Sequence, residues 1–266
     1  MRFPEGRAKA LTFSYDDNVR DNLRLIDIFN RHGMKATFNI NSGLYGRGAR
    51  YLSKEEFTAL FADGRHEVAI HSSTHPFLGQ LPSALAGYDL MKDREALEEQ
   101  FGRIVRGMAY PNNSYNDEVV NALRACGVVY ARTTDTTERF DLPSDWMRLP
   151  ATCHHSCPRL MELAKKFVSR PTYAPQLFYV WGHSYEFEDN NNWEIIEEFT
   201  EFLAPHADEI WFATNIEIYE YVEAYRRLVF SFDGRIVHNP TARELFFLYD
   251  KAPIRILPGE TLRLED

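Results

Sequence analysis

Apolar residues recur along the chain in two alternating patterns. Short apolar runs typical of buried strands lie at residues 10–15, 35–41, 67–70, 107–111, 128–131, 176–183 and 209–213. Apolar residues at helical spacing lie between and after them, at 18–32, from 53 onward, and at 83–101, 117–126, 158–168, 193–203 and 218–227. Ser53 and Glu56 form a capping-box pattern that marks one helix start. Strands alternating with helices over short loops predict βαβ units and a parallel sheet.

The strand count narrows the fold class. About seven parallel strands in a chain of 266 residues favour an α/β fold of the distorted TIM-like (β/α) barrel type, which needs roughly 250 residues. We expect this barrel to be the catalytic domain, over residues 1–227. From residue 228 the pattern changes to a hairpin around Asp233-Gly234, followed by short strands at 244–249 and 254–257. Residues 228–266 therefore predict a small β appendage, a structural cover for the barrel or an oligomer contact.

Composition excludes several classes of protein. The chain is 44% hydrophobic and 26% charged, as expected for an ordinary globular protein. A net charge of −9 without a basic stripe argues against a nucleic-acid partner. No apolar run of about 18 residues could span a membrane, and no signal-peptide pattern opens the chain, so we expect a cytoplasmic protein. Three cysteines cannot form a disulfide framework, which agrees with a reducing compartment.

Candidate chemistry begins at His71 and His75, which directly follow the apolar run 67–70. Two histidines four residues apart can meet on one face of a helical turn and share a divalent metal ion. Such pairs also occur on helix surfaces without metal, so a further ligand is required. Asp16 and Asp17, at the end of another predicted strand, can supply it, although Asp pairs also cap helices. One aspartate and two histidines leave a coordination position open for water, as a catalytic zinc site requires.

The polar candidates share a position in the predicted fold. Each follows the carboxyl end of a predicted strand, where barrel enzymes carry their active sites. The set comprises Asp16, Asp17, His71, His75, Asn112 and His183.

With these residues assembled, the chain resembles the polysaccharide deacetylases over residues 8–225. This metal-dependent family includes chitin, chitooligosaccharide and peptidoglycan deacetylases. Its T-F-D-D motif resembles Thr12-Phe13-Ser14-Tyr15-Asp16-Asp17, with two residues between the phenylalanine and the aspartate pair. Its H-[ST]-x-x-H motif is matched in full by His71-Ser72-Ser73-Thr74-His75, and its L-x-H motif resembles Val180-Trp181-Gly182-His183.

The resemblance implies a role for each matched residue. Asp17, His71 and His75 would hold Zn²⁺ or another divalent ion such as Co²⁺, Ni²⁺ or Mn²⁺. Asp16 would be the general base and His183 the general acid, which agrees with the chemistry of metal-assisted hydrolysis. Adjacent strand residues point to opposite faces, so Asp16 and Asp17 can share a pocket only where the strand bends into its loop.

The chain departs from the family pattern in two places. Asn18 stands where the family usually has glycine, which a turn can accept. Ala109 replaces the arginine of the R-x-P-[YF]-G motif, and we expect Arg148, with Arg132 as second choice, to supply that charge. The backbone N–H of Asn112, after the motif's proline, is the expected oxyanion donor.

Substrate contacts are expected from aromatic residues near these motifs. Trp146 lies where the family has its D-x-x-D-W motif; it either walls the acyl pocket or stacks on a sugar ring, or else belongs to the core. Tyr110, Tyr115 and His155 are further candidates, and His154 or His155 could reach the site from a strand end. Cys153 and Cys157 flank these histidines, but their spacing is not that of a common zinc module.

The sequence therefore predicts a metal-dependent hydrolase that removes an acetyl group from an N-acetylated sugar or glycan. The expected partner is an acetylated oligosaccharide or a small acylated substrate, with no nucleic acid and no membrane, and a homo-oligomer is possible. Alternatives are an amidohydrolase or O-acetyl esterase acting on a small non-glycan substrate, and a carbohydrate-binding barrel without activity. Retention of both Asp16 and His183 argues against the last, because binding alone needs neither a base nor an acid.

Overall fold

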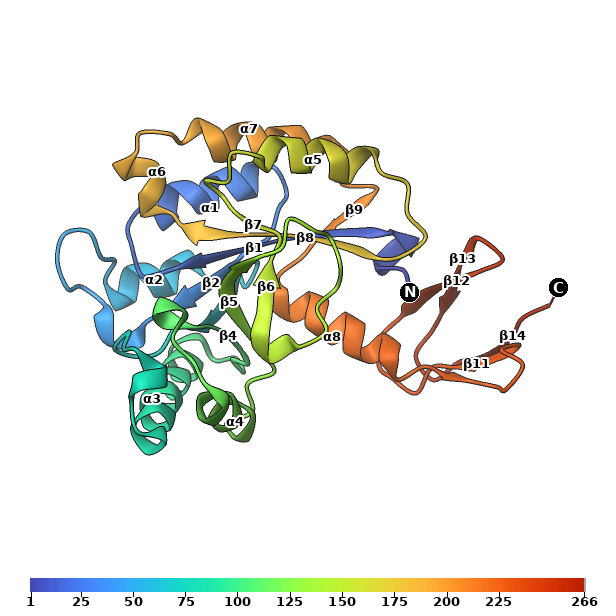
Figure 1. Cartoon of the computed structure of the whole chain (residues 1–266), viewed down its shortest axis with the longest axis horizontal. Helices are drawn as coiled ribbons and strands as arrows, with labels where there is room; N and C mark the ends of the chain where they lie inside the picture. Colours follow the sequence, from blue (N-terminus) through green and yellow to red (C-terminus); the bar gives the residue numbers. More distant parts are fainter. Residues whose placement is uncertain (266) are drawn as a thin grey trace.

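The computed structural model describes residues 1–265, and a parallel sheet surrounded by helices dominates it (Figure 1). Within these residues the sheet has nine strands, in the order β6-β5-β4-β3-β2-β1-β8-β7, with β9 also paired to β1. Their bounds are β1 (Lys9–Asp16), β2 (Thr37–Ile40), β3 (Glu67–Ile70), β4 (Gly107–Ala109), β5 (Tyr130–Thr136), β6 (Leu149–Ala151), β7 (Cys153–His154), β8 (Gln176–His183) and β9 (Ile210–Phe212). All its ladders are parallel, which confirms the predicted α/β class.

Helices carry the chain from one parallel strand to the next and cover the sheet. In Figure 1, α1, α5 and α7 lie on one side of the strands, while α3 and α4 lie on the other. The helices are α1 (Asn22–Arg31), α2 (Lys54–Leu60), α3 (Ser83–Phe101), α4 (Asp117–Ala125), α5 (Leu160–Ser169), α6 (Tyr185–Asp189), α7 (Glu194–Leu203) and α8 (Asn215–Arg226). None of those in residues 1–265 combines the length and apolarity needed to cross a bilayer.

The two end strands of the sheet belong to one stretch of chain. Only Thr152 separates β6 from β7, and its backbone N–H donates to the carbonyl of Tyr179 at 2.8 Å. The sheet thus curves back on itself, as in the predicted distorted barrel. Within the described residues β6 and β7 do not pair with each other, so the ladder is not closed.

Strand β1 is the centre of the molecule. All eight of its residues are buried, and its apolar side chains, among them Leu11 and Phe13, form part of the main core. It pairs with β8 along its whole length, so Asp16 is the register partner of His183. On its other edge Asp16 is the partner of Asn39 in β2. Strand pairing therefore places three polar residues side by side at one end of the sheet.

The C-terminal part forms two small antiparallel sheets, as the predicted β appendage requires. Strands β10 (Val229–Phe230), β11 (Ile236–His238) and β14 (Thr261–Arg263) make one, and β12 (Leu245–Tyr249) and β13 (Ala252–Ile256) make the other. The sheets pack on the barrel through contacts such as the backbone N–H of Phe246 with the Tyr221 hydroxyl, at 3.0 Å. They lie away from the carboxyl ends of β1 and β8 (Figure 1). The boundary between residues 227 and 228 remains a proposal, and Asp266 lies outside the described residues.

Several element bounds differ from those the sequence predicted. Helix α1 begins at Asn22 rather than at residue 18, because Asn18 is buried in a turn where its side chain bonds both backbone groups of Asn41. Strand β5 starts later than predicted and runs on to Thr136. Elements β6, β7, α6 and β14 were not predicted; they are two to five residues long, which is too short for a periodic pattern.

Candidate functional site

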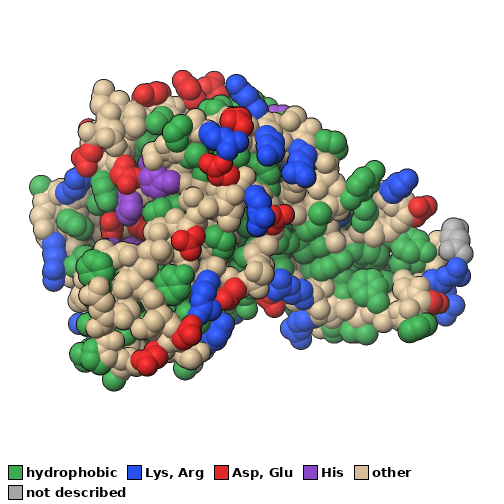
Figure 2. All heavy atoms as spheres, in the orientation of Figure 1, with side chains coloured by type: hydrophobic (Ala, Val, Ile, Leu, Met, Phe, Trp, Pro, Cys, Tyr) green, Lys and Arg blue, Asp and Glu red, His purple; other side chains and the backbone are tan. Residues whose placement is uncertain are grey.

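Acidic and imidazole side chains gather at the carboxyl ends of the parallel strands. In Figure 1, β1 and β8 run toward the left, and Figure 2 shows histidine and acidic side chains together on that side of the molecule. Asp16 ends β1, His183 ends β8, and His71 follows the last residue of β3. The side chains that the sequence predicted at the carboxyl ends of these strands therefore lie together in the structure.

Asp16 lies at the centre of this cluster and is 3% exposed. Its Oδ1 accepts a hydrogen bond from Asn39 Nδ2 at 2.8 Å, and its Oδ2 pairs with the Arg132 guanidinium. Burial alone would raise the pKa of Asp16, but Arg132 and the two flanking imidazoles lower that pKa to about 2. The carboxylate is thus ionised at neutral pH, as a proton acceptor must be.

Asp17 reaches the same pocket because the backbone bends directly after β1. Its φ is +74°, in the left-handed region that aspartate tolerates better than most residues. Adjacent residues of a regular strand point to opposite faces, and this bend is what allows Asp16 and Asp17 to face the same site. The next residue, Asn18, stands where the family usually has glycine, but its φ is not positive. This position therefore does not require glycine in this chain.

His71 and His75 meet through a loop and not through a helical turn, which corrects the prediction. Residues 71–75 form no helix, and both Ser72 and His75 have positive φ values, of 65° and 55°. The two rings nevertheless lie with their centroids 4.9 Å apart. His71 is buried, while His75 is partly exposed.

The donor atoms of Asp17, His71 and His75 fit one divalent metal ion. They lie within 4.8 Å of one another, and His75 Nε2 is 3.9 Å from Asp17 Oδ1. Two ligands about 2.1 Å from a zinc ion can be at most about 4.2 Å apart, so small side-chain movements suffice. His71 Nδ1 donates to the carbonyl of Ala109 at 2.8 Å, which leaves Nε2 to face the site. This is the usual orientation of a metal-ligating histidine.

Asn112 lies next to the metal-ligand candidates. It has a φ of +55°, and its side-chain nitrogen is 3.5 Å from the backbone oxygen of His75. The loop that follows Pro111 therefore borders the site, and the role of the Asn112 amide as oxyanion donor remains a proposal.

His183 bridges Asp16 and a second carboxylate. Its Nε2 is 3.8 Å from Asp16 Oδ2, and its Nδ1 is 3.3 Å from Glu186 Oε1. Burial would lower the pKa of His183, but the Glu186 hydrogen bond and the nearby aspartates outweigh burial and raise it. A raised pKa favours the protonated imidazole that a general acid needs.

The arginine that pairs with Asp16 is Arg132, and the first choice, Arg148, was wrong. Arg132 is 1% exposed on β5, and its guanidinium also stacks over the Trp181 ring at 4.5 Å. Arg148 is instead turned toward the surface, where it donates to Asp145 at 2.9 Å and pairs with Asp117.

The expected aromatic contacts lie mostly in the core. Trp146 belongs to the cluster that packs on α8, and its Nε1 donates to Glu223 at 3.1 Å, so the core alternative holds. Tyr110 is buried, with its hydroxyl bonded to the carbonyl of Met147 at 2.9 Å and its ring stacked on Tyr115. These contacts give Trp146 and Tyr110 structural partners in place of a substrate.

His155 is also buried, and its Nε2 lies 3.0 Å from Glu186 Oε2. Both His154 and His155 contact Glu186, which in turn contacts His183. A role for either histidine in the active site stays a prediction. A direct substrate contact by His155 is not consistent with its burial.

Sequence reasoning missed three residues that shape the site. Asn39 and Glu186 are described above, and Asp93 on α3 is the third. Asp93 accepts from the backbone N–H of His71 at 3.1 Å and from that of Ser42 at 2.7 Å, and burial raises its pKa to about 7. The helical pattern of the sequence could have indicated Asp93. Residues 86, 90, 93 and 97 share the buried face of α3, and Asp93 is the polar residue on that face.

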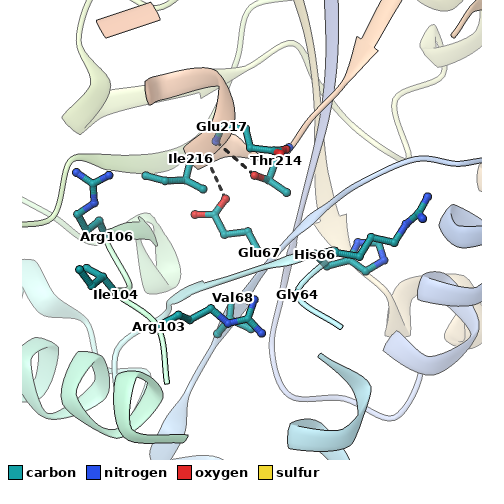
Figure 3. A pocket seen from close by; sticks show the side chains of 11 residues that line it. Gly64, His66, Glu67, Val68, Arg103, Ile104, Arg106, Thr214, Ile216 and Glu217 are labelled. Carbon is teal, nitrogen blue, oxygen red and sulfur yellow. Dashed lines mark hydrogen bonds between the residues drawn. The ribbon is translucent and has the colours of Figure 1, made fainter. Parts of the chain in front are cut away.

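A half-buried carboxyl lies at the opposite end of β3. Glu67 borders a pocket of about 170 Å³, and Figure 3 shows its carboxyl pointing toward the start of α8. It accepts from the backbone N–H of Ile216 at 2.9 Å and from the hydroxyls of Thr37 and Tyr130, each at 2.8 Å. Its acceptor atoms are thus occupied by elements of the fold, which indicates a structural role.

Several solved structures, some of them of carbohydrate-active proteins, share the fold of this chain. A Mycobacterium smegmatis protein assigned to the polysaccharide deacetylases is 17% identical, with 85% of this chain and 94% of that chain covered and a TM-score of 0.63. A family 4 carbohydrate esterase from Streptomyces lividans, in complex with acetate, is 16% identical (77% and 92% covered, TM-score 0.51). A family 4 pseudoenzyme from Bacillus anthracis is 18% identical (82% and 66% covered, TM-score 0.52). At these identities the likeness shows the fold alone.

Coverage of other matching structures is smaller. The chain spans 55% of the length of a deacetylase from Streptococcus pyogenes and 44% of a polysaccharide deacetylase from Bacillus cereus. None of the curated proteins matches with significant similarity.

A family model gives the more specific result. The model described as polysaccharide deacetylase matches residues 4–131, which carry the aspartate pair, both histidines of the metal set and the loop at Asn112. Over these residues, just under half of the chain, the protein is therefore similar to the polysaccharide deacetylase family, and its fold is one that a solved structure assigned to this family shares.

Proposed function

We propose that this protein is a divalent-metal-dependent hydrolase that removes an acetyl group from an N-acetylated sugar or glycan. The observation that carries the proposal is the grouping of Asp17, His71 and His75, with donor atoms within 4.8 Å, beside Asp16 and His183. A metal site alone could be structural. The ionised carboxylate and the imidazole of raised pKa beside it are the groups that hydrolysis requires.

The candidate metal ligands, the acid and the base each have a separate role in the proposed reaction. Asp17, His71 and His75 would hold a divalent ion, and the chemistry such an ion would supply is Lewis-acid activation of water and of the acyl carbonyl. Asp16 accepts the proton of the attacking water. Protonated His183 donates a proton to the departing amine, which would otherwise leave as a very basic anion. Asn39 and Arg132 hold the Asp16 carboxylate in place from two sides.

Charge that develops on the acyl oxygen also needs a donor. We assign this role to the backbone N–H of Asn112, in the loop that borders His75. A backbone donor does not depend on side-chain identity, so asparagine at this position is compatible with the role.

Similarity to the family does not by itself establish activity. A Bacillus anthracis protein of the same fold is a pseudoenzyme, and a mutant of it has restored activity. In this chain the residues that we propose as acid and base lie close to the three candidate ligands, which supports catalysis over a binding role.

The substrate class follows from the family and from the charge of the molecule. Matching structures include an esterase in complex with acetate, and we propose acetyl as the group removed here as well. The net charge of −9 does not favour a strongly anionic polymer. A neutral acetylated oligosaccharide or a small acylated molecule fits better.

Acetate release from N-acetylated chitooligosaccharides tests the proposal. The protein is stripped with a chelator and then reloaded with zinc, cobalt, nickel or manganese. Release should vanish on stripping and return with metal, and Asp16→Asn should slow it by about 10²–10⁴-fold while metal stays bound. Glu188→Gln, a carboxamide replacement on α6, serves as the matched control and should keep the full rate.

The alternative outcomes are informative. Bound metal without acetate release would overturn the glycan substrate, and small amides and O-acetyl esters would then be tested. Release that persists in the stripped protein would overturn the metal-dependent mechanism.

A further inference from the structure

A carboxylate outside the assigned catalytic set accepts hydrogen bonds from three histidines. Glu186, in the first turn of α6, has its Oε2 3.1 Å from His154 Nε2 and 3.0 Å from His155 Nε2. Its Oε1 is 3.3 Å from His183 Nδ1. Burial would raise the pKa of Glu186, but hydrogen bonds from the three imidazoles lower it strongly, so the group is a carboxylate.

The same atoms could in principle bind a second metal ion, because donors of His154, His155 and Glu186 lie within 4.8 Å of one another. The second nitrogen of His155 argues against it. A metal-ligating histidine almost always donates its other N–H to an acceptor, as His71 does to Ala109. His155 Nδ1 is buried without a partner among the described residues, so a proton there would be an unpaired buried donor. The proton therefore lies on Nε2, which donates to Glu186.

Packing fixes the His155 ring in this orientation. It stacks on Phe187 with centroids 4.1 Å apart and lies parallel to Tyr15 at 5.7 Å. On the side of β8, a Cβ atom at position 182 would lie 2.1 Å from His155 Nδ1, so only glycine allows the ring to lie there. His155 is thus a rigid donor, and with His154 it holds one oxygen of Glu186.

We propose that Glu186, held by His154 and His155, is the positioning residue for His183 in the reaction assigned above. The free oxygen of Glu186 receives the Nδ1–H of His183, which leaves Nε2 facing Asp16 and the reacting group. This inference rests on the proposed function, because it assigns the partner of its general acid. Glu186 itself stays behind His183 and transfers no proton.

The chemistry of the leaving group gives a direct test. Departure of an amine requires a proton from His183, whereas 4-nitrophenolate leaves without one. In Glu186→Gln, the amide carries one oxygen and one NH₂ group in place of two acceptors. With its oxygen on His154 and His155, its NH₂ would face the Nδ1–H of His183 and disfavour the protonated imidazole.

The experiment compares two substrates on the metal-loaded protein. For N-acetylated chitooligosaccharide, Glu186→Gln should lower kcat by at least about 10²-fold with KM nearly unchanged. For 4-nitrophenyl acetate, the same variant should keep its rate within roughly fivefold, because that step needs no acid. Glu188→Gln on the same helix is the control, and it should match wild type on both substrates. Equal losses on both substrates would overturn the proposal and assign Glu186 a purely structural role.

A measurement independent of turnover separates this inference from the proposed function. Long-range ¹⁵N–¹H spectra of the histidine side chains in the full chain should show an Nδ1–H on His183 and Nε2–H groups on His154 and His155. The Nδ1–H signal of His183 should be lost in Glu186→Gln. A second equivalent of bound metal that disappears in His154→Gln would instead identify a metal site and contradict the network. Wild-type protein with these tautomers but without acetate release would overturn the proposed function alone.

Discussion

At the residue scale, the balance of charges around Asp16 decides what the site can do. A buried carboxylate is costly unless it is paired and hydrogen-bonded. Asp16 has both, with Arg132 on one oxygen and Asn39 on the other. Its depressed pKa therefore contributes stability that is present at neutral pH and is lost as the pH falls from about 4 toward about 2.

Replacing Arg132 should damage both the fold and the chemistry. In Arg132→Gln, burial of Asp16 is no longer compensated by a cation, so the pKa of Asp16 rises. We expect a loss of about 3–5 kcal/mol in the free energy of unfolding, measured with urea, since one partner of a buried pair is removed. Acetate release should fall at least about tenfold.

The matched control is Arg148→Gln. Arg148 pairs with Asp117 and Asp145 near the surface, and such pairs contribute about 0–1 kcal/mol. Its activity should remain close to that of wild type. Equal losses in the two variants would show that Arg132 has no special relation to Asp16.

The sequence alone did not determine which of these two arginines pairs with Asp16. Arg132 follows a predicted strand, whereas Arg148 lies in a stretch without a predicted element, and sequence alone does not reveal which of the two side chains points toward Asp16. That depends on where β5 begins and on its register with β4 and β6. The positions of the metal-ligand candidates were easier to predict, because Asp17 and His71 come directly after apolar runs that mark strands, and His75 lies in the same loop as His71.

At the element scale, strongly patterned segments were predicted well. Helix α3 and strand β8 have the predicted bounds. A long amphipathic segment and a continuous apolar run each determine the type and the extent of the element. The stretch around Thr152 was not predicted as strands, because β6 and β7 are only three and two residues long. Helix α6, which carries Glu186, has five residues and no apolar period of its own.

The capping box at the start of α2 gives a prediction about the stability of a helix that carries no residue of the candidate site. Ser53 Oγ accepts from the backbone N–H of Glu56 at 3.2 Å, and the Glu56 carboxylate accepts from that of Ser53 at 2.8 Å. Ser53→Ala should cost about 1 kcal/mol in thermal or urea unfolding. Ser53→Asp should restore most of it, because aspartate also caps helices. An unchanged stability in Ser53→Ala would contradict a contribution from the cap.

At the scale of the whole molecule, the two ends of the sheet serve different purposes. The carboxyl ends of the strands carry the candidate site, whereas Glu67 lies at the opposite end. It bonds to Tyr130 of β5 and to the backbone of Ile216 in α8, and Figure 3 shows the second of these bonds. The C-terminal sheets pack near that second end, away from the site (Figure 1). We therefore propose a structural role for residues 228–266.

Glu67 should make stability depend on pH. Burial raises the pKa of Glu67 to about 7, despite hydrogen bonds from Ile216, Tyr130 and Thr37 that lower it. Between about pH 4.5 and 7 the folded protein keeps a proton that the unfolded chain has lost, so this group's contribution to stability falls as pH rises through that window. In Glu67→Gln, the fall in Tm between pH 5 and 8 should be smaller by a few degrees. Parallel Tm profiles for the two proteins would contradict the raised pKa.

The central claim is that Asp17, His71 and His75 form one metal centre, and zinc titration of the stripped protein by calorimetry tests it most directly. His75 is partly exposed, so His75→Ala should fold and report on metal binding rather than on packing. We predict one equivalent of zinc for wild type and for Asp16→Asn, and no tight binding for His75→Ala. Stoichiometric zinc binding by His75→Ala, or none by wild type, would contradict the assignment.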